Sequence, residues 1–317
     1  LIENLRELFY AFIKSIAAAI DDKSPFTGGH INRVVTLTMD IADTINQSQT
    51  ETFKDIHFND DEMEELRLAA WMHDVGKIIT PEYIVSKTNK LEGVFDRVEV
   101  IETRFALIRQ LLEADFLRQK IDILNTSKTE AEKADRLAAL QETADHELAQ
   151  LAADLKLLKS INTNKALADE ETTPKVRAIA AKTYTVDGQT YPYLTKKETA
   201  CLTIIRGNLL PEERRVIEHH AEMTRKITEE LPFPHSLANV PEYASGHHEK
   251  LDGSGYPRGL AGDEIPIQSR IIAIADVFEA LTAKDRPYKT PMNISQALKI
   301  LGFMEKGQAR LQRGLIA

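Results

Sequence analysis

The chain has 317 residues, of which 43% are hydrophobic and 28% charged, and its formal net charge is −9 at pH 7. This composition is typical of a globular protein, and the length allows one large domain or two. The negative charge argues against a general nucleic-acid binder, because such proteins bind mainly through the phosphate backbone. It is compatible with one small anionic ligand held by local cations.

The sequence also bears on the compartment of the protein. Cys201 is the single cysteine, which excludes disulfides and thiolate metal sites and agrees with a reducing cytosol. No apolar run reaches the roughly 18 residues of a membrane span. The first residues, Leu1-Ile2-Glu3-Asn4, lack both Met and the basic start of a secretory signal. We therefore expect a cytoplasmic protein that is a fragment of a longer chain.

Residues 1–22 are expected to form an amphipathic helix. Apolar side chains recur there at helical spacing, on Leu5, Leu8, Phe9, Phe12, Ile16 and Ile20. The stripe fits a plain core helix or a helix that pairs with a second copy of itself. Because the chain lacks Met, we hypothesise an upstream sensor domain that signals through this helix in a homodimer.

Helices are also predicted on both sides of the middle of the chain. His30 opens one after a break, and Asn59 is a candidate N-cap for another that stops near Gly76. Later, residues 242–250 are predicted to form a short helix that carries two histidines, and residues 267–282 an apolar, buried helix. Strand-like alternation is scarce, so we expect an all-α fold.

The middle of the chain contains two heptad patterns. They lie at Val94, Val98, Ile101, Phe105, Ile108 and Leu112, and at Leu137, Ala144, Leu148, Leu151, Leu155 and Leu158. Joined by the polar stretch 125–135, they predict an antiparallel helical hairpin. We interpret residues 92–205 as an insertion, with a small irregular segment around 186–192 at its end. A purely structural spacer is the simplest role for it.

The first candidate for chemistry is the pair His73-Asp74, with Lys77 four residues after the histidine. The spacing predicts that His73 and Lys77 share a helix face. A His-Asp pair alone is weak evidence, because it also occurs where an aspartate caps a helix end. Here it follows the apolar run 69–72, and buried charges are costly unless they are paired or bound to metal.

Other candidates lie towards the end of the chain. His220 falls on the apolar stripe of its helix, and Asp276 stands in an apolar helix where a bare carboxylate needs a cation. His247-His248-Glu249 is followed by Asp252 and then by a loop with two glycines and a proline. Imidazoles and carboxylates suit divalent Mn, Fe or Zn, and glycines let a ligand approach the backbone.

Together these positions give seven candidate metal ligands: His30, His73, Asp74, His220, His247, His248 and Asp276. A catalytic zinc needs about three protein ligands, so the set is too large for one ion. It suffices for two metals that share a bridging carboxylate. Two metals about 4 Å apart clamp the attacking and leaving oxygens of an in-line displacement. The residues therefore predict phosphoester hydrolysis.

The motifs resemble those of the HD-GYP family, bacterial HD-superfamily phosphodiesterases that act on the second messenger cyclic di-GMP. The resemblance is carried by His73-Asp74-Val75-Gly76-Lys77, by His247-His248-Glu249 with Asp252-Gly253-Ser254-Gly255-Tyr256-Pro257, and by Asp276 with Arg286-Pro287-Tyr288. It covers residues 20–91 and 206–300. It implies an HD-superfamily helical bundle formed by residues 23–91 and 206–317 and interrupted by the inserted hairpin.

The resemblance also implies roles for individual residues. His30, His73 and Asp276 would hold one metal, His220, His247 and His248 the second, and Asp74 would bridge them. Lys77 matches a catalytic lysine that contacts a hydroxide activated by the two metals or protonates the leaving oxygen. Substrate binding would fall to Arg286, Lys289, Gly255, Tyr256 and Pro257.

One position departs from part of the family. Members with three metals carry a glutamate four residues before the first ligand histidine, where this chain has Phe26. The resemblance therefore implies two divalent metals, Fe or Mn, and cleavage of cyclic di-GMP mainly to linear pGpG. Further cleavage to GMP stays open.

Three alternatives remain. The same chemistry could act on another cyclic dinucleotide such as 3′,3′-cyclic GMP-AMP. A general HD nucleotide phosphohydrolase is a second enzyme class, although the Gly-Tyr-Pro string argues against it. The third is a catalytically silent module that senses a nucleotide or docks a partner such as a GGDEF-type cyclase. Silent members of the family have lost a ligand, and this chain has all seven.

Overall fold

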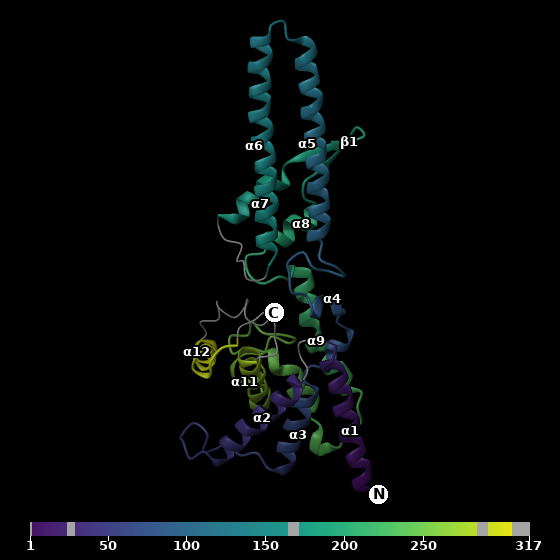
Figure 1. Ribbon diagram of the computed structural model, residues 1–317. Helices are drawn as coiled ribbons and strands as arrows, with labels where there is room; N and C mark the ends of the chain where they lie inside the picture. The colour runs from purple at the N-terminus through teal and green to yellow at the C-terminus, as the bar shows by residue number, and fades with distance from the viewer. Residues whose placement is uncertain (1, 24–28, 164–170, 284–290, 306–317) are drawn as a thin grey trace. The chain divides into compact units, whose positions relative to one another are not determined.

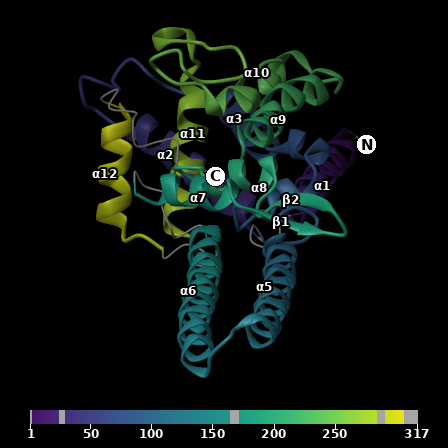
Figure 2. The ribbon, with the colours of Figure 1, turned by 90° about the horizontal axis from the view of Figure 1, so that it is seen from above.

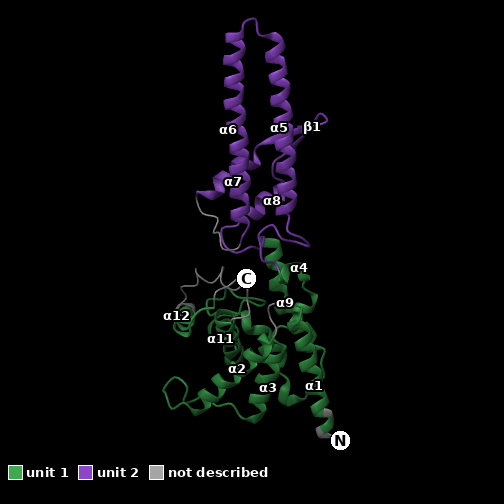
Figure 3. Cartoon of the chain, in the orientation of Figure 1, with its two compact units in different colours: residues 1–86, 211–317 green, residues 87–210 purple. Residues whose placement is uncertain are grey.

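The computed structural model describes residues 2–23, 29–163, 171–283 and 291–305 (Figure 1). The chain divides into two compact units, residues 1–86 with 211–317 and residues 87–210 (Figure 3). Most described residues are helical, and the sheet found among them has only two strands, which confirms the predicted all-α fold. Among the described residues, no helix is both long and apolar enough to cross a membrane.

The first unit, which we call the ligand unit, contains all seven candidate metal ligands. Its elements are α1 (Ile2–Asp21), α2 (His30–Gln47), α3 (Asp60–Met72), η1 (Val75–Ile79), α4 (Glu82–Val85), α9 (Pro211–Glu229), η2 (His235–Leu237), α10 (Val240–Ser245), η3 (Gly246–His248), η4 (Gly262–Glu264), α11 (Ile267–Thr282) and α12 (Ile294–Glu305). Helices α1, α2, α3, α10 and α11 all contribute to one apolar core. Residues such as Leu66 and Ile272 are fully buried in it.

The start of α3 shows how the sequence sets an element boundary. The Asn59 side chain accepts a hydrogen bond from the Glu62 backbone N–H, and the Glu62 carboxylate accepts one from the Asn59 N–H. This reciprocal pair satisfies two donors that a helix start leaves without partners. The predicted N-cap at Asn59 is therefore confirmed, and it fixes the helix that ends next to His73.

Helix α1 differs in part from the predicted stripe. It packs against α2, α3 and η1, and it buries Ile13, Ala17 and Ile20 in the core. Leu8 and Phe12 belong to the predicted stripe, yet they are 66% and 56% exposed. The spacing alone placed both residues on the buried face, because a stripe several residues wide does not show which of its edges faces the core. The described part of α1 is thus a core helix with an apolar outer edge.

The second unit is built on a long helical hairpin. It contains α5 (Val98–Thr126), α6 (Glu130–Asn162), α7 (Thr172–Ala180), β1 (Thr183–Val186), β2 (Gln189–Pro192) and α8 (Lys196–Leu202). Helices α5 and α6 run side by side in both views (Figures 1 and 2). Ile101, Phe105 and Ile108 of the predicted heptad are buried, whereas Val94 precedes the helix and is 88% exposed.

The segment predicted to be irregular forms a β-hairpin instead. Strands β1 and β2 pair antiparallel, with Val186 opposite Gln189. The two residues between them, Asp187 and Gly188, both have positive φ. An Asp-Gly pair is a strong signal for this two-residue turn, so the sequence did contain the information.

Candidate metal centre

All seven candidate ligands lie together in the ligand unit, although they come from separate elements. His30 is the first residue of α2, His73 directly follows α3, and Asp74 precedes η1. The remaining ligands lie on α9, η3 and α11, namely His220, His247, His248 and Asp276. Five of the seven are buried, and His248 and Asp276 are half-buried.

The first group of ligands consists of His30, His73 and Asp74, whose nearest ligand atoms all lie within 4.8 Å of one another. Asp276 joins this group through its Oδ1 atom, which is 3.4 Å from His30 Nε2. We call these four residues the carboxylate half of the centre, because two of them are aspartates.

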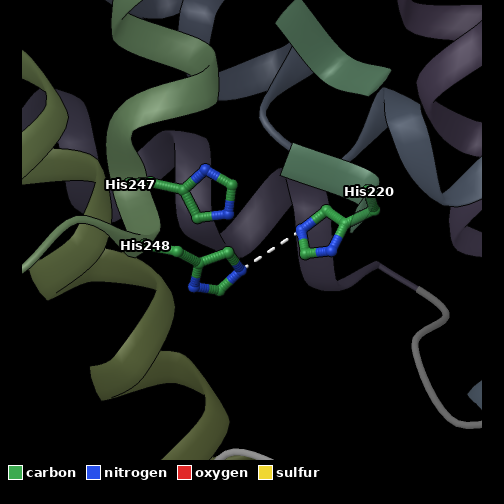
Figure 4. A group of neighbouring side chains, drawn as sticks. All are labelled: His220, His247 and His248. Atoms are coloured by element: carbon green, nitrogen blue, oxygen red, sulfur yellow. Dashed lines mark hydrogen bonds between the residues drawn. The ribbon is translucent and has the colours of Figure 1, made fainter. Parts of the chain in front are cut away.

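The second group consists of three histidines, His220, His247 and His248, whose ligand atoms also lie within 4.8 Å of one another. Figure 4 shows the two neighbouring rings of η3 facing the ring from α9, with His248 Nε2 3.2 Å from His220 Nε2. The ring centroids of His247 and His248 are 4.0 Å apart. We call this group the imidazole half.

Asp74 is the member of the carboxylate half that also contacts the imidazole half. Its Oδ1 atom is 3.4 Å from His220 Nε2, and its Oδ2 atom is 3.3 Å from His73 Nε2 and 3.9 Å from His30 Nε2. One carboxylate oxygen thus faces each half. This is the arrangement expected of a carboxylate that is shared by two metal ions.

Three of the histidines are oriented by their own helical turns. The Nδ1 atoms of His73, His220 and His247 lie 2.8, 2.5 and 2.7 Å from the carbonyl oxygens of the residues three positions earlier, Ala70, Ile217 and Ala244. A carbonyl only accepts, so each ring donates its Nδ1–H and keeps the Nε2 lone pair. That tautomer is the one that binds a metal through Nε2.

His30 is oriented differently, because the first residue of a helix has no preceding helical turn. Its Nδ1 atom is 2.5 Å from Oε2 of Glu279, which is buried on α11 one turn after Asp276. Arg33 holds the other carboxylate oxygen from its Nε and Nη2 atoms at 2.8 and 2.7 Å. Sequence reasoning missed Glu279. The signal was a second carboxylate three residues after Asp276 in the same apolar helix.

The pKa of His30 in the carboxylate half and those of the three histidines in the imidazole half shift in opposite directions. Burial lowers the pKa of His220 to about 4 and that of His247 to about 3, and it takes the pKa of His248 well below its ordinary value. Burial also disfavours charged His30, but hydrogen bonds and charge from Asp276 and Glu279 outweigh it and raise that pKa to about 9. The imidazole half is therefore neutral, and the carboxylate half stabilises positive charge.

Buried polar atoms without hydrogen-bond partners are a separate observation that supports a metal centre. His73 Nε2, Asp74 Oδ1 and His247 Nε2 are buried and have no hydrogen-bond partner among the described residues. Leaving a buried polar atom unpaired costs about 1–3 kcal/mol, and three such atoms point into one cluster. Imidazole nitrogens and carboxylate oxygens are the donors that divalent transition metals prefer.

Lys77 lies beside the bridging carboxylate, with its Nζ atom 2.5 Å from Asp74 Oδ2. The prediction that it shares a helix face with His73 was wrong. Helix α3 ends at Met72, and Asp74 leaves helical geometry with φ −105° and ψ 7° before η1 begins. Lys77 therefore reaches Asp74 from the next short helix.

Gly76 allows η1 to approach α9 closely. A Cβ atom on Gly76 would lie 1.9 Å from the carbonyl oxygen of His220 and 2.5 Å from the backbone nitrogen of Thr224. Instead, the Gly76 N–H donates to Thr224 Oγ1 at 3.0 Å, and that hydroxyl donates to the carbonyl of His73 at 3.0 Å. This contact ties one end of the carboxylate half to the helix that carries His220.

The sequence predicts an α-helix over residues 242–250 that carries the paired histidines, but the structure places both on a 3-10 turn. Helix α10 ends at Ser245, and η3 carries both rings. A Cβ atom on Gly246 would lie 2.6 Å from Ser269 Oγ, so the glycine lets this turn pack against α11. Both rings of this turn belong to the imidazole half.

The loop after η3 is held by Glu249 and Asp252, two acids that follow the paired histidines in the sequence. Glu249 accepts from the backbone N–H groups of Arg258 and Leu260, and Asp252 accepts from the N–H and the hydroxyl of Ser254. Both carboxylates therefore shape the loop instead of facing the metal ligands.

Gly255 and Tyr256 lie close to the imidazole half. A Cβ atom on Gly255 would lie 2.5 Å from Glu249 Cα, so this position needs glycine. The Tyr256 ring centroid is 4.8 Å from that of His248, and a cis peptide bond joins Tyr256 to Pro257. The predicted substrate residues Arg286 and Lys289 and the position of Phe26 lie outside the described residues.

The chain is similar to HD domains in two stretches. Two family models described as HD domain match the chain, one over residues 27–175 and the other over residues 197–310. A 3'3'-cGAMP-specific phosphodiesterase 3 from Vibrio cholerae is 47% identical over 95 residues, which are 30% of this chain and 20% of that protein. A cyclic di-GMP phosphodiesterase from Thermotoga maritima is 42% identical over 93 residues, 29% of this chain and 25% of that protein.

A third relative is the cyclic di-GMP phosphodiesterase response regulator RpfG from Xanthomonas campestris, which is 50% identical over 62 residues, 20% of this chain and 16% of that protein. The matched stretch thus spans a quarter or less of the length of each of these three relatives.

Proposed function

The chain belongs to the HD-domain family and to its HD-GYP branch, and from this premise we propose that it is a metal-dependent phosphodiesterase that hydrolyses cyclic di-GMP. The observation that carries the proposal is the position of Asp74. One of its oxygens faces His220, and the other faces His30 and His73. Two adjacent metal sites that share a carboxylate are suited to phosphoester hydrolysis.

We further propose two divalent metals, iron or manganese. His30, His73 and Asp276 would hold one, His220, His247 and His248 the other, and Asp74 both. Bound metals would supply Lewis-acid activation of water and neutralise charge on the phosphoryl oxygens. The buried atoms without partners, His73 Nε2, Asp74 Oδ1 and His247 Nε2, support this assignment.

The chain's own side chains have separate tasks in the proposal. The Lys77 side chain is 31% exposed and its ammonium contacts Asp74. The ammonium can therefore contact both the candidate metal centre and a substrate bound there from solvent. It would orient the attacking water or donate a proton to the leaving oxygen. Tyr256 would flank the scissile phosphate beside His248, and Arg286 and Lys289 would bind phosphate oxygens.

A second substrate is favoured by a specific finding. Three relatives with 46–47% identity are named 3'3'-cGAMP-specific phosphodiesterases, and others of similar identity are named cyclic di-GMP phosphodiesterases. The ligands that we assign to the metals would serve either substrate, because the phosphodiester is the same. Cyclic GMP-AMP is therefore the alternative substrate.

The test is direct. Protein purified without oxygen and loaded with iron or manganese is incubated separately with cyclic di-GMP and 3′,3′-cyclic GMP-AMP, and the products are separated by chromatography. We expect linear pGpG from the first substrate, with little GMP, and two metals per chain. The Asp74→Ala variant should lose both metals and turnover. A metal-loaded protein that cleaves neither nucleotide would contradict the proposal.

Further proposals concern the domains of the chain and its partners. Residues 92–205 would be an insertion into the catalytic domain formed by residues 23–91 and 206–317, and residues 1–22 would transmit a signal from a sensor domain through a homodimer. A GGDEF-type cyclase is a candidate partner. Sedimentation of the protein over a range of concentrations tests the dimer, which a monomer at all concentrations would contradict.

A further inference from the structure

Lys23 makes the contacts from which a further role can be inferred. It lies two residues after the end of α1 and is half-buried. Its Nζ atom lies 3.0, 2.7 and 2.5 Å from the carbonyl oxygens of Lys77, Ile78 and Thr80. An ammonium has three N–H donors, so each of them has one backbone acceptor.

The three carbonyls lie at the end of η1 and just beyond it. The last carbonyls of a helix carry the negative end of its dipole and lack the partners that interior carbonyls have. Here the Lys77 carbonyl also accepts from the Thr80 backbone N–H at 3.0 Å. A cation at this end is therefore favourable. Lys23 reaches these acceptors from a segment more than fifty positions earlier, as the separation of 54 from Lys77 shows.

The same short helix is held on its other side by α9. Gly76 packs against the backbone of His220 and donates to Thr224 Oγ1. The backbone of Lys77 thus lies between two fixed contacts, the hydroxyl of Thr224 at the preceding residue and the ammonium of Lys23 at its own carbonyl. Its side chain reaches Asp74 from this position.

We propose that Lys23 is a positioning residue for Lys77, which ties the end of α1 to the backbone that carries the reacting lysine. The inference rests on the role proposed above for Lys77. Lys23 acts on the backbone of Lys77, and its three acceptors are backbone carbonyls of residues that are not metal ligands. Removing its ammonium leaves the metal ligands in place but takes one donor from each of the three carbonyls, of which that of Lys77 keeps the Thr80 N–H, and lets residues 77–80 shift.

The experiment replaces Lys23 by methionine, which keeps the length of the side chain and removes the charge. A misplacement of about 1 Å can cost about a hundredfold in rate. We expect kcat with the cleaved cyclic dinucleotide to fall by about tenfold to a hundredfold, while KM and the metal content per chain stay those of the unaltered protein. Lys54→Met is the matched control, because Lys54 pairs with exposed Glu51 on the surface, and its kcat should not change.

A double variant separates positioning from a general loss of structure. In a Lys77→Met background, Lys23→Met should cause little further loss, because both act through the same group. A full additional loss there, a fall in metal content, or an unchanged kcat in the single variant would overturn the inference.

Hydrogen exchange tests the placement without turnover, so that it stays decidable if the unaltered protein cleaves no cyclic dinucleotide. The backbone amides of residues 75–80 should exchange faster in Lys23→Met than in Lys54→Met. Equal exchange in the two variants would overturn the inference whatever the outcome for the proposed function.

Discussion

The two halves of the metal centre use the same ligand type in different surroundings. In the imidazole half, the rings of His220 and His247 are held by backbone carbonyls, and burial keeps them neutral. In the carboxylate half, His30 is held by Glu279 and lies beside Asp276, which raise its pKa. A ring whose Nδ1–H donates to a carboxylate is a stronger metal donor than one that donates to a carbonyl. We therefore expect the carboxylate half to bind its metal more tightly.

The largest effect should come from breaking the imidazole half alone. His220→Ala removes one of three nitrogens, so metal content should fall by about half and turnover by about a thousandfold or more, because a catalytic metal supplies several kcal/mol. His219→Ala is the matched control, since His219 is the exposed neighbour paired with Glu222. Metal analysis and product chromatography measure both. Loss of both metals in His220→Ala would show that the halves do not bind independently.

The halves should also respond oppositely to pH when metal is removed by chelation. Unfolded histidine has a pKa near 6.5, so His220 with a pKa of about 4 destabilises the fold as pH falls from 6.5 to 4. The difference corresponds to about 3 kcal/mol. His30, with a pKa of about 9, contributes stability that is fully present below pH 6.5 and lost as pH rises to 9.

This prediction is checked by denaturant unfolding of the metal-free protein between pH 4 and pH 9. His220→Asn should flatten the acid limb and leave the alkaline limb, and Glu279→Gln should flatten the alkaline limb alone. Identical effects of the two substitutions on both limbs would contradict the difference between the halves.

A smaller effect is expected when the carboxylate that orients His30 is neutralised. Glu279→Gln keeps the size of the side chain but weakens the hydrogen bond to His30 Nδ1. The affinity for the metal of the carboxylate half should therefore fall by about tenfold to a hundredfold. Titration of the metal-free protein with Mn²⁺ should show this loss in the tighter of two binding steps. A change confined to the weaker step would assign the tighter site to the imidazole half.

The smallest effect should come from Arg33→Met. The guanidinium holds Glu279 Oε1, whereas His30 contacts Oε2 of the same carboxylate, and the Arg33 side chain is 43% exposed. Water can replace part of this contact, because partly exposed ion pairs contribute little. The affinity for the metal of the carboxylate half should therefore fall by less than about tenfold. A loss as large as that of Glu279→Gln would show that Arg33 is essential to the orientation of His30.

The sequence predicted which residues come together better than it predicted the elements that carry them. The seven candidate ligands were chosen from short motifs and from polar residues at buried helical positions, and the structure brings them together. Glu279 was not found, because its contact with His30 depends on where α2 begins and on how α11 packs against it. The sequence also did not show that η3 is a 3-10 turn. The predicted helix over residues 242–250 ran through Gly246, whose close packing against Ser269 depends on the tertiary structure.

Packing also decided what periodicity could not. The seven-residue spacing predicted both helices of the hairpin, but the side of α1 that faces the core depended on its contacts with α3 and η1. Arg286 and Lys289 lie outside the described residues, so their predicted roles stay predictions.

The contact between Gly76 and Thr224 has a consequence for how the chain folds. The hydrogen bond joins positions 148 residues apart, with the whole second unit between them in sequence. Contacts of such high sequence separation close late, because the entropy of a long loop is lost before they form. During synthesis, His30 and His73 are made long before their partner ligands exist. Because the two metals would share Asp74, metal binding would join the halves late in folding, and holo protein should unfold more slowly than apo protein.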